Sequence, residues 1–415
     1  MNDSANSVLA LFQPEEIRRK AHSLLEKASL GKLSHVEVDL SAMDKALVAT
    51  LEATKRNYPD FQIPPYGVWR DFETGGIDRW GALAGARAFE SAEEMLASAA
   101  DLAAISIYMK TRRPDDWVFQ DPMTGTEASG TEASALAAFH MFASGAFSSD
   151  MGDPYRVDAE TLIRMETVEL AGALQWDPQR DADLLGELQA HLKRLGEALA
   201  LRSDLFSEGE DTRPGLLATQ LAKNSGSAVD AGTVLDRLLE SLAPVWKGGA
   251  VSGDITLGDC FAHSEAPGPE FENFYPFHMC AQEIVYSLVE PFAWAGWEVA
   301  GLDVLTAPAD DRHVGLFVKS GVLKIRDADI GLSSAEALQD RMIELREVSV
   351  ALTDRLADML CAELDVPSEQ LPLSCILEAG SARAGGLILL ENEDEAKKLG
   401  RLLNPGAVFW LPFRA

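Results

Sequence analysis

The chain has 415 residues, of which 47% are hydrophobic and 25% are charged, a balance typical of a folded globular protein. Its 66 acidic residues exceed its 36 basic ones, so the formal net charge is −30 and the surface repels nucleic-acid backbones and anionic lipid. We therefore expect neither a nucleic-acid nor a membrane partner. The first residues lack the basic and apolar stretches of a secretory leader, and no apolar run has the length of a bilayer span, so we expect a cytoplasmic protein.

The cysteines and histidines show no pattern typical of a disulfide framework or a zinc site. The cysteines form no CxxC pair, and the histidines form neither an HxxxH nor an HxH pair. We predict buried free thiols and expect no metal or other cofactor. The residues concerned are Cys260, Cys280, Cys361 and Cys375, with His22, His35, His140, His191, His263, His278 and His313.

Helical patterns dominate from the start of the chain. Pro14 opens the first predicted helix and Gly31 follows it, while Ser91 and Glu94 form a capping box that opens a later one. We predict a mainly α fold with a few short strands. Predicted helices cover about 14–30, 41–57, 91–112, 131–145, 159–174, 182–201, 230–243, 279–295 and 334–364, and predicted strands cover 35–40, 314–325, 386–390 and 407–411.

The length of the chain favours two lobes around a cleft, because single hydrophobic cores usually stop growing well below 400 residues. The polar stretch 207–213 is the best candidate for the boundary, so we predict an N-terminal helical lobe at 1–206 and a C-terminal one at 207–415 within one continuous family domain. Residues 58–80 combine prolines, glycines and aromatics, a composition that indicates an ordered irregular loop.

The run GLDVLTAPADDRHVG gathers Asp303, Asp310, Asp311 and Arg312, and we expect these acids on a turn that enters a strand. A carboxylate buried beside Arg312 stays ionised, and a fixed anion stabilises a developing oxocarbenium cation. Taken alone, however, such a run is more often a solvated turn with structural ion pairs than a reaction centre.

Three other segments carry candidate groups. Glu344 and Glu347 lie one turn apart in the long C-terminal helix, where surface charge is the commoner explanation. The aromatic stretch 271–292 is suited to lining a ligand pocket but is also typical of a core. Arg70 and Arg79 flank a Gly-Gly pair at which a phosphate could dock, although the run matches no established phosphate-binding motif.

Several of these segments, taken in order, resemble a bacterial and fungal family long described as a domain of unknown function, whose members accompany a uracil-degradation route. The C-terminal half is more distantly similar to the queuosine-phosphate salvage hydrolases, helical relatives of DNA glycosylases that cleave a base from ribose 5-phosphate. The matching stretches are YPDFQIPPYGVWRDFETGGIDRW, SGAFSSDMGDPYRVDAETL, FYPFHMCAQEIVYSLVEP, LDVLTAPADDRHVGLFVKSGVL, ELREVSVALTD and LPLSCILEAGSARAG.

The resemblance implies a DNA-glycosylase-like helical core and an N-glycosidase that acts on a small ribosyl substrate, a ribosyl-urea or nucleoside with or without a 5′-phosphate. It places Asp310 on the catalytic aspartate, with Glu344 as a second catalytic carboxylate, and either of the two could orient water. No cofactor is implied, and the oligomeric state is left open. The implied substrate-binding residues are Trp69, Arg70, Phe277, His278, Gln282, Asp303, Arg312, Arg346 and Glu378.

The chain departs from the family pattern at the expected pocket. Met279 stands where the family has a lysine and Ala382 where it has a tryptophan, so a cation and a stacking surface are missing. YGVWRDF replaces HSRWRHF, and Asp-Asp-Arg at 310–312 replaces Glu-Tyr-Arg. One alternative is therefore a non-catalytic ligand-binding or assembly relative of the enzymes.

A second alternative is a metal-dependent amidohydrolase, which requires His263, His278 or His313 to meet carboxylates at bonding distance. The enzyme hypothesis requires instead that the candidate side chains converge on one concave pocket.

Overall fold

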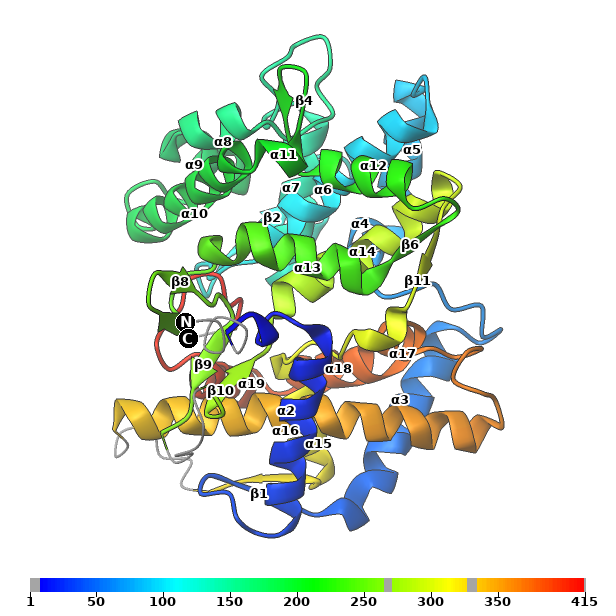
Figure 1. The fold of residues 1–415 in the computed structure, drawn as a ribbon, viewed down its shortest axis with the longest axis vertical. Coiled ribbons are helices and arrows are strands. Elements are labelled where there is room, and N and C mark those ends of the chain that lie inside the picture. Colours follow the sequence, from blue (N-terminus) through cyan, green and yellow to red (C-terminus); the bar gives the residue numbers. More distant parts are fainter. Residues whose placement is uncertain (1–7, 265–270, 327–333, 414–415) are drawn as a thin grey trace.

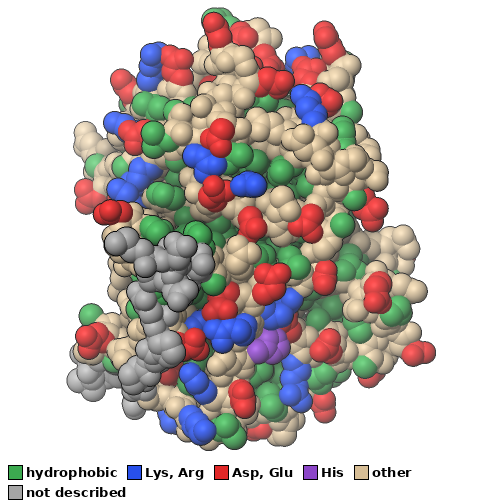
Figure 2. Space-filling view, in the orientation of Figure 1, with side chains coloured by type: hydrophobic (Ala, Val, Ile, Leu, Met, Phe, Trp, Pro, Cys, Tyr) green, Lys and Arg blue, Asp and Glu red, His purple; other side chains and the backbone are tan. Residues whose placement is uncertain are grey.

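The computed structural model describes residues 8–264, 271–326 and 334–413, drawn as a ribbon in Figure 1 and as a space-filling view in the same orientation in Figure 2. The described parts are mainly helical, with eighteen α-helices and strands of only two or three residues, and every sheet among them has two strands. This confirms the predicted mainly α class.

The helices are α2 (Pro14–Ser29), α3 (Met43–Asn57), α4 (Trp69–Phe72), α5 (Arg79–Arg87), α6 (Ala92–Tyr108), α7 (Gly130–Ala143), α8 (Ala159–Arg164), α9 (Thr167–Leu174), α10 (Ala182–Leu201), α11 (Ser203–Phe206), α12 (Gly215–Asn224), α13 (Ala231–Leu242), α14 (Met279–Trp294), α15 (Asp311–Ser320), α16 (Ala335–Leu364), α17 (Leu373–Ile376), α18 (Ala382–Glu391) and α19 (Glu393–Leu403). The strands are β1 (Val36–Val38), β2 (Val118–Gln120), β3 (Glu127–Ser129), β4 (Ser207–Glu208), β5 (Asp211–Thr212), β6 (Ala228–Asp230), β7 (Val251–Ser252), β8 (Ile255–Thr256), β9 (Cys260–Ala262), β10 (Phe274–Pro276), β11 (Glu298–Ala300) and β12 (Leu323–Ile325).

Helices with strong local signals form where the sequence predicts them. Helix α10 has the predicted bounds, and its buried leucines lie on one face. Pro14 opens α2, and the Ser91 hydroxyl accepts a hydrogen bond from the Glu94 amide at the start of α6. The short strand β1 lies within the predicted strand 35–40.

Three predicted strands are wrong. Residues 311–320 form helix α15, because Asp310 caps its amides and Gly321 ends it with a φ of 81°, and only Leu323–Ile325 of that stretch is a strand. Residues 386–390 belong to α18, and 407–411 form turns. The predicted helix 159–174 is interrupted at Met165, whose ψ of 133° separates α8 from α9.

Segments from the two ends of the chain pack together in the lower part of Figure 1. Helix α2 crosses α16, α3 contacts α16 and α18, and β1 pairs with β12 in antiparallel register. Helix α14 packs against α6 and lies between this layer and the helices α7–α12 above it. The loop after α3, the start of α15 and α14 thereby lie close to one another. The lobe boundary at 206/207 stays a prediction.

The helical run Leu373–Glu391, which joins α17 and α18 through a π-helical turn at Leu377–Ser381, is long and apolar enough by composition to cross a membrane. About half of it, 56%, is buried within the protein. The sequence analysis did not anticipate this run. The four cysteines are free thiols, with Cys260 and Cys280 buried and Cys361 and Cys375 partly buried.

Candidate active site

Asp310 is the N-cap residue of α15 and is 4% exposed. One carboxylate oxygen accepts hydrogen bonds from the His313 backbone amide (3.0 Å) and from Nδ1 of the His313 ring (2.7 Å). The other accepts a hydrogen bond from Nε of Arg312 at 2.6 Å. Burial alone would raise the pKa of Asp310, but the charge of Arg312 and the contacts with His313 outweigh it and hold this pKa well below its usual range. Asp310 is therefore a fixed anion.

The His313 ring is held from both sides. Its Nε2 lies 3.1 Å from Oγ of Ser381, the last residue of the π-helical turn, and both side chains are fully buried. The order Asp310, His313, Ser381 is that of a serine-hydrolase triad. Because Ser381 has no exposed surface, we do not interpret it as a nucleophile. We interpret this row of hydrogen-bonded side chains as a support that fixes the Asp310 carboxylate.

Arg312 continues the network towards α14 and α6. Its NH2 group donates to the Tyr66 hydroxyl at 2.8 Å, and that hydroxyl donates to Glu283 at 3.2 Å. Lys110 donates to the same Glu283 oxygen at 2.9 Å and lies 3.2 Å from Asp71. The charges alternate along this path, so each buried ion has a partner of opposite sign.

The approach of the 66–69 loop to α14 positions Tyr66. A Cβ at Gly67 would lie 3.0 Å from the Cα of Ser287, so only glycine allows this contact without a shift. The Val68 amide donates to the Ser287 hydroxyl at 3.2 Å, and the Trp69 indole donates to the Ser287 carbonyl at 2.7 Å. The irregular loop predicted from the sequence is thus ordered by α14.

Asp311 follows the fixed anion, and its pKa is shifted in the opposite direction. Its side chain is partly exposed, and burial together with the neighbouring Asp310 charge raises the pKa of Asp311 to about 6, against the opposing effect of Arg312 and Arg113. Two adjacent carboxyl groups therefore have pKa values that their surroundings push in opposite directions, which is the pattern of an acid and a base placed side by side.

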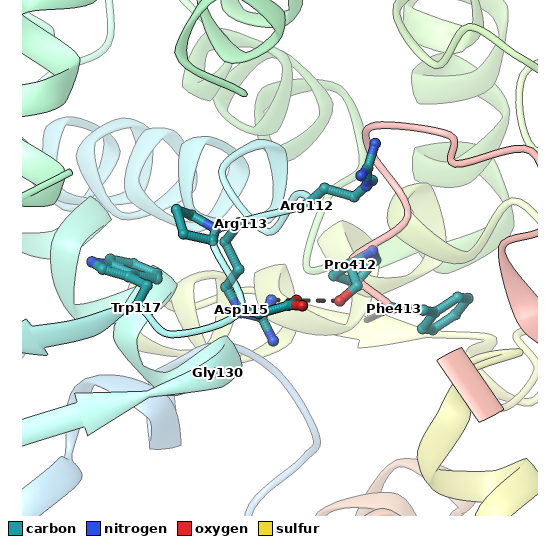
Figure 3. A pocket seen from close by; sticks show the side chains of 8 residues that line it. Arg112, Arg113, Asp115, Trp117, Gly130, Pro412 and Phe413 are labelled. Atoms are coloured by element: carbon teal, nitrogen blue, oxygen red, sulfur yellow. Dashed lines mark hydrogen bonds between the residues drawn. The ribbon is translucent and has the colours of Figure 1, made fainter. Parts of the chain in front are cut away.

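A small pocket of about 40 Å³ lies where the segment 112–117, the start of α7 and the C-terminal residues Pro412 and Phe413 meet (Figure 3), and neither Asp310 nor Asp311 lines it. Arg113, which lines the pocket, lies close enough to Asp311 to lower its pKa. The ring centroid of Phe413, also in the lining, lies 6.0 Å from Cζ of Arg346, and Nε of Arg346 donates to the carbonyl of Ala309. Figure 3 shows Arg113 reaching towards the carbonyl of Pro412, which accepts its hydrogen bond. The lining residues are Arg112, Arg113, Pro114, Asp115, Trp117, Gly130, Pro412 and Phe413.

A second, larger cleft of about 400 Å³ opens where α4 and the start of α5 meet the end of α14. Its volume lies in the range of small-molecule sites. Arg70 contributes to its wall and bonds Glu290 at 2.9 Å. Arg79, by contrast, is 1% exposed and held by Asp121 and two carbonyls, so it does not serve as a surface cation. The cleft is lined by Trp69, Arg70, Phe72, Glu73, Asp78, Trp80, Gly81, Met95, Glu290 and Trp294.

Glu344, expected beside Asp310, has a different set of neighbours. Its carboxylate accepts hydrogen bonds from the amides of His35 (2.9 Å) and Ser34 (3.3 Å), and His263 lies 3.5 Å away. It is fully buried and fixes the chain that leads into β1.

Arg346 is also fully buried. It binds both oxygens of Asp259 at 2.9 and 3.0 Å and lies over the Phe277 ring at 3.8 Å. The Arg346 guanidinium holds the carbonyl of Ala309, the residue before Asp310, and does not face solvent.

The side chains of Gln282 and His278, two other expected substrate-binding residues near α14, form hydrogen bonds with backbone groups. Gln282 accepts from the Thr306 amide at 2.8 Å and donates to the Phe277 carbonyl at 2.9 Å, which ties α14 to the segment before Asp310. His278, with a φ of 44°, lies 2.8 Å from the Leu11 carbonyl through its Nε2. Asp303 is exposed, and its carbonyl accepts from Arg18.

Glu378, in the π-helical turn, is 4% exposed and pairs with Tyr58 (3.0 Å) and Arg383 (2.7 Å). Met279 and Ala382, at the positions where the family pattern has a lysine and a tryptophan, are both buried.

The sequence analysis considered His313 only as a metal ligand and missed the other partners that complete the network: Tyr66, Lys110, Glu283 and Ser381. His313 had one local signal, since the third residue after an N-cap is placed to meet the capping side chain. The others come from distant segments, and only the fold brings them together.

Within residues 8–264, 271–326 and 334–413, no group of three or more His, Cys, Asp or Glu side chains has the arrangement of a metal site. His313 does meet a carboxylate, Asp310, as the amidohydrolase alternative requires, but its second nitrogen faces Ser381.

Comparison with known proteins places the chain in a family. The model of the family described as "Protein of unknown function (DUF1688)" matches residues 10–398. "Uracil catabolism protein 4" of Lachancea kluyveri is 27% identical over 396 residues, covering 86% of this chain and 87% of the relative. "Protein urg3" of Schizosaccharomyces pombe is 28% identical over 400 residues, covering 93% and 94%. The family resemblance expected from the sequence is confirmed, and the chain belongs to the DUF1688 family.

Proposed function

We propose that this protein acts in uracil catabolism as an N-glycosidase-type hydrolase that cleaves the bond between C1′ of a ribose and a urea or base nitrogen. The name of the Lachancea kluyveri relative supports the pathway. The observation that carries the chemistry is the acidic pair, in which Asp310 is locked by Arg312 and His313 while its partly exposed neighbour Asp311 has no such lock.

In the proposed reaction the two carboxyls have separate roles. The protonated Asp311 gives its proton to the departing nitrogen as the C1′–N bond breaks, and the Asp310 anion stabilises the positive charge that develops on the sugar. Water then adds to C1′ and returns a proton to Asp311, so the products are urea, or a base, and ribose. A pKa of Asp311 near 6 leaves part of the population protonated at neutral pH.

The pocket in Figure 3 is a suitable seat for an anionic end of the substrate, such as a 5′-phosphate. It holds Arg113 and lies at the N-terminus of the fourteen-residue helix α7, whose first residue is Gly130. A guanidinium and helix amides both favour an anion. A volume of about 40 Å³ accommodates such a group but not a whole nucleoside.

The test is release of urea or base from ribosyl-urea, uridine and their 5′-phosphates, together with ribose from the first two and ribose 5-phosphate from the phosphorylated ones. We expect Asp310→Asn and Asp311→Asn each to lower kcat by about 10²-fold or more. The exposed Asp183→Asn in α10 is the matched control and should change kcat less than about twofold. No release from any member of the panel contradicts the proposal and favours a ligand-binding role.

The anion seat is tested separately with Arg113→Gln. We expect this variant to raise KM for a phosphorylated substrate by about tenfold and to leave the unphosphorylated one little changed, since a lost charge-assisted hydrogen bond costs roughly 1.5–3 kcal/mol. Equal effects on both substrates contradict a phosphate seat at Arg113.

A further inference from the structure

The cleft between α4, α5 and α14 has a wall of three tryptophans. The ring centroid of Trp69 lies 4.7 Å from that of Trp294 and 5.4 Å from that of Trp80. The rings of Trp80 and Trp294 are nearly parallel, with their centroids 6.0 Å apart. Trp69 and Trp80 are buried, but Trp294 is 39% exposed. The cleft therefore offers an accessible indole supported from behind by two others.

The charges around this wall are mostly negative. Arg70 bonds both oxygens of Glu290, at 2.9 and 3.2 Å, and lies 3.3 Å from Glu73. Asp78 adds a further carboxylate, which caps α5 through the Gly81 amide at 2.7 Å. Three carboxylates thus line the cleft against one cation, so the lining carries an excess of acidic groups.

This charge balance selects the sign of a ligand. The one guanidinium in the lining is already paired with Glu290 and with Glu73, so an incoming anion would find no unpaired cation there and would meet an excess of carboxylates. A cation would meet those carboxylates and the negative face of an indole, and an ammonium or guanidinium group over tryptophan is the strongest form of that contact. Neither Asp310 nor Asp311 lines this cleft.

We propose that the cleft is a second binding site, separate from the acidic pair, which takes a small organic cation with an ammonium or guanidinium group against Trp294 and the carboxylates of Glu73 and Asp78. The volume of about 400 Å³ is sufficient for a compact molecule of this class. The inference does not depend on the proposed hydrolase activity, because the cleft and the acidic pair share no lining residue.

The test is calorimetric titration of the full chain with tetramethylammonium and with agmatine, and with inorganic phosphate as the anionic probe. We expect saturable binding of both cations and none of phosphate in this cleft. Trp294→Ala and Glu73→Gln should each weaken cation binding by about two- to tenfold. The exposed Leu390→Ala in α18 is the control for truncation of an apolar surface side chain and should bind as wild type.

The Glu73 side chain is 44% exposed, so Glu73→Gln should fold normally even if Trp294→Ala does not. Unchanged cation affinity in both variants overturns the proposal. So does the absence of saturable cation binding by the wild type, or phosphate binding that Glu73→Gln strengthens.

Discussion

The acidic pair and the tryptophan cleft arrange charge in opposite ways. In the charged network that includes Asp310, the side chains of Asp310 and Lys110 are each 10% exposed or less. Each of these two groups lies within 3.2 Å of a group of opposite charge. In the cleft, Glu73 is 44% exposed and the carboxylates outnumber Arg70. Buried and evenly matched charges are fixed in position, whereas exposed carboxylates in excess over cations can attract a ligand of opposite charge. The two proposals therefore place the reaction and the second ligand in different parts of the molecule.

The largest expected difference is in stability. Lys110→Met leaves Glu283 buried without its ammonium partner, and we expect the free energy of unfolding to fall by about 3–5 kcal/mol. Urea denaturation monitored by circular dichroism measures it. A loss below about 1 kcal/mol contradicts the view that the network depends on matched buried charges.

The acidic pair also predicts how stability changes with pH. The pKa of Asp311, about 6 when folded, exceeds the value near 3.9 expected in the unfolded chain, so the folded state binds more protons between about pH 4 and 6. Stability should therefore fall as pH rises through this window, by up to about 3 kcal/mol relative to Asp311→Asn.

Asp310 has the opposite effect on how stability changes with pH. Its folded pKa is lowered, so its contribution is present above about pH 4 and is lost as pH falls further. Unfolding free energies of wild type, Asp310→Asn and Asp311→Asn between pH 3 and 8 separate the two effects. Parallel curves for all three proteins contradict the assignment.

A smaller effect is expected at Tyr66, whose hydroxyl joins Arg312 to Glu283. Tyr66→Phe removes two hydrogen bonds but leaves the ring in place, so we expect a loss of about 1–3 kcal/mol. Thermal denaturation together with the kcat of the hydrolase assay shows whether the bridge also keeps Arg312 against Asp310. An unchanged melting temperature and kcat mean that the bridge has no role.

The smallest effect is expected in the cleft. Arg70→Met breaks a partly exposed ion pair with Glu290, and such pairs contribute about 1 kcal/mol or less. The same denaturation experiment as for Lys110→Met provides the comparison. A loss for Arg70→Met that equals or exceeds that for Lys110→Met removes the distinction between the two regions.

Local signals in the sequence predicted local structure well. Capping at Ser91 and the leucine face of α10 describe their helices because neighbouring residues carry the whole signal. Residues 314–325 are predicted as a strand, yet the cap at Asp310 and Gly321 in the left-handed region favour a helix over 311–320.

In the candidate site, too, only contacts between residues close in the sequence could be predicted. The contact of Asp310 with Arg312 spans two residues, and a pairing of this kind could be anticipated from the sequence. The contacts of Arg312 with Tyr66 and of His313 with Ser381 span 246 and 68 residues, so no local pattern contains them. Glu344 shows the converse, because helical spacing does not reveal that the amides of residues 34 and 35 occupy its carboxylate.

The central claim is that the pKa values of two adjacent carboxyls are shifted in opposite directions, and carboxyl ¹³C NMR titration of aspartate-labelled protein tests it most directly. The account predicts one carboxyl that titrates near pH 6 and disappears in Asp311→Asn, and a second that stays ionised below pH 4 and disappears in Asp310→Asn. The account is contradicted if Asp311→Asn removes no resonance with a midpoint above about pH 5, since Asp311 would then be as ionised as an ordinary surface aspartate.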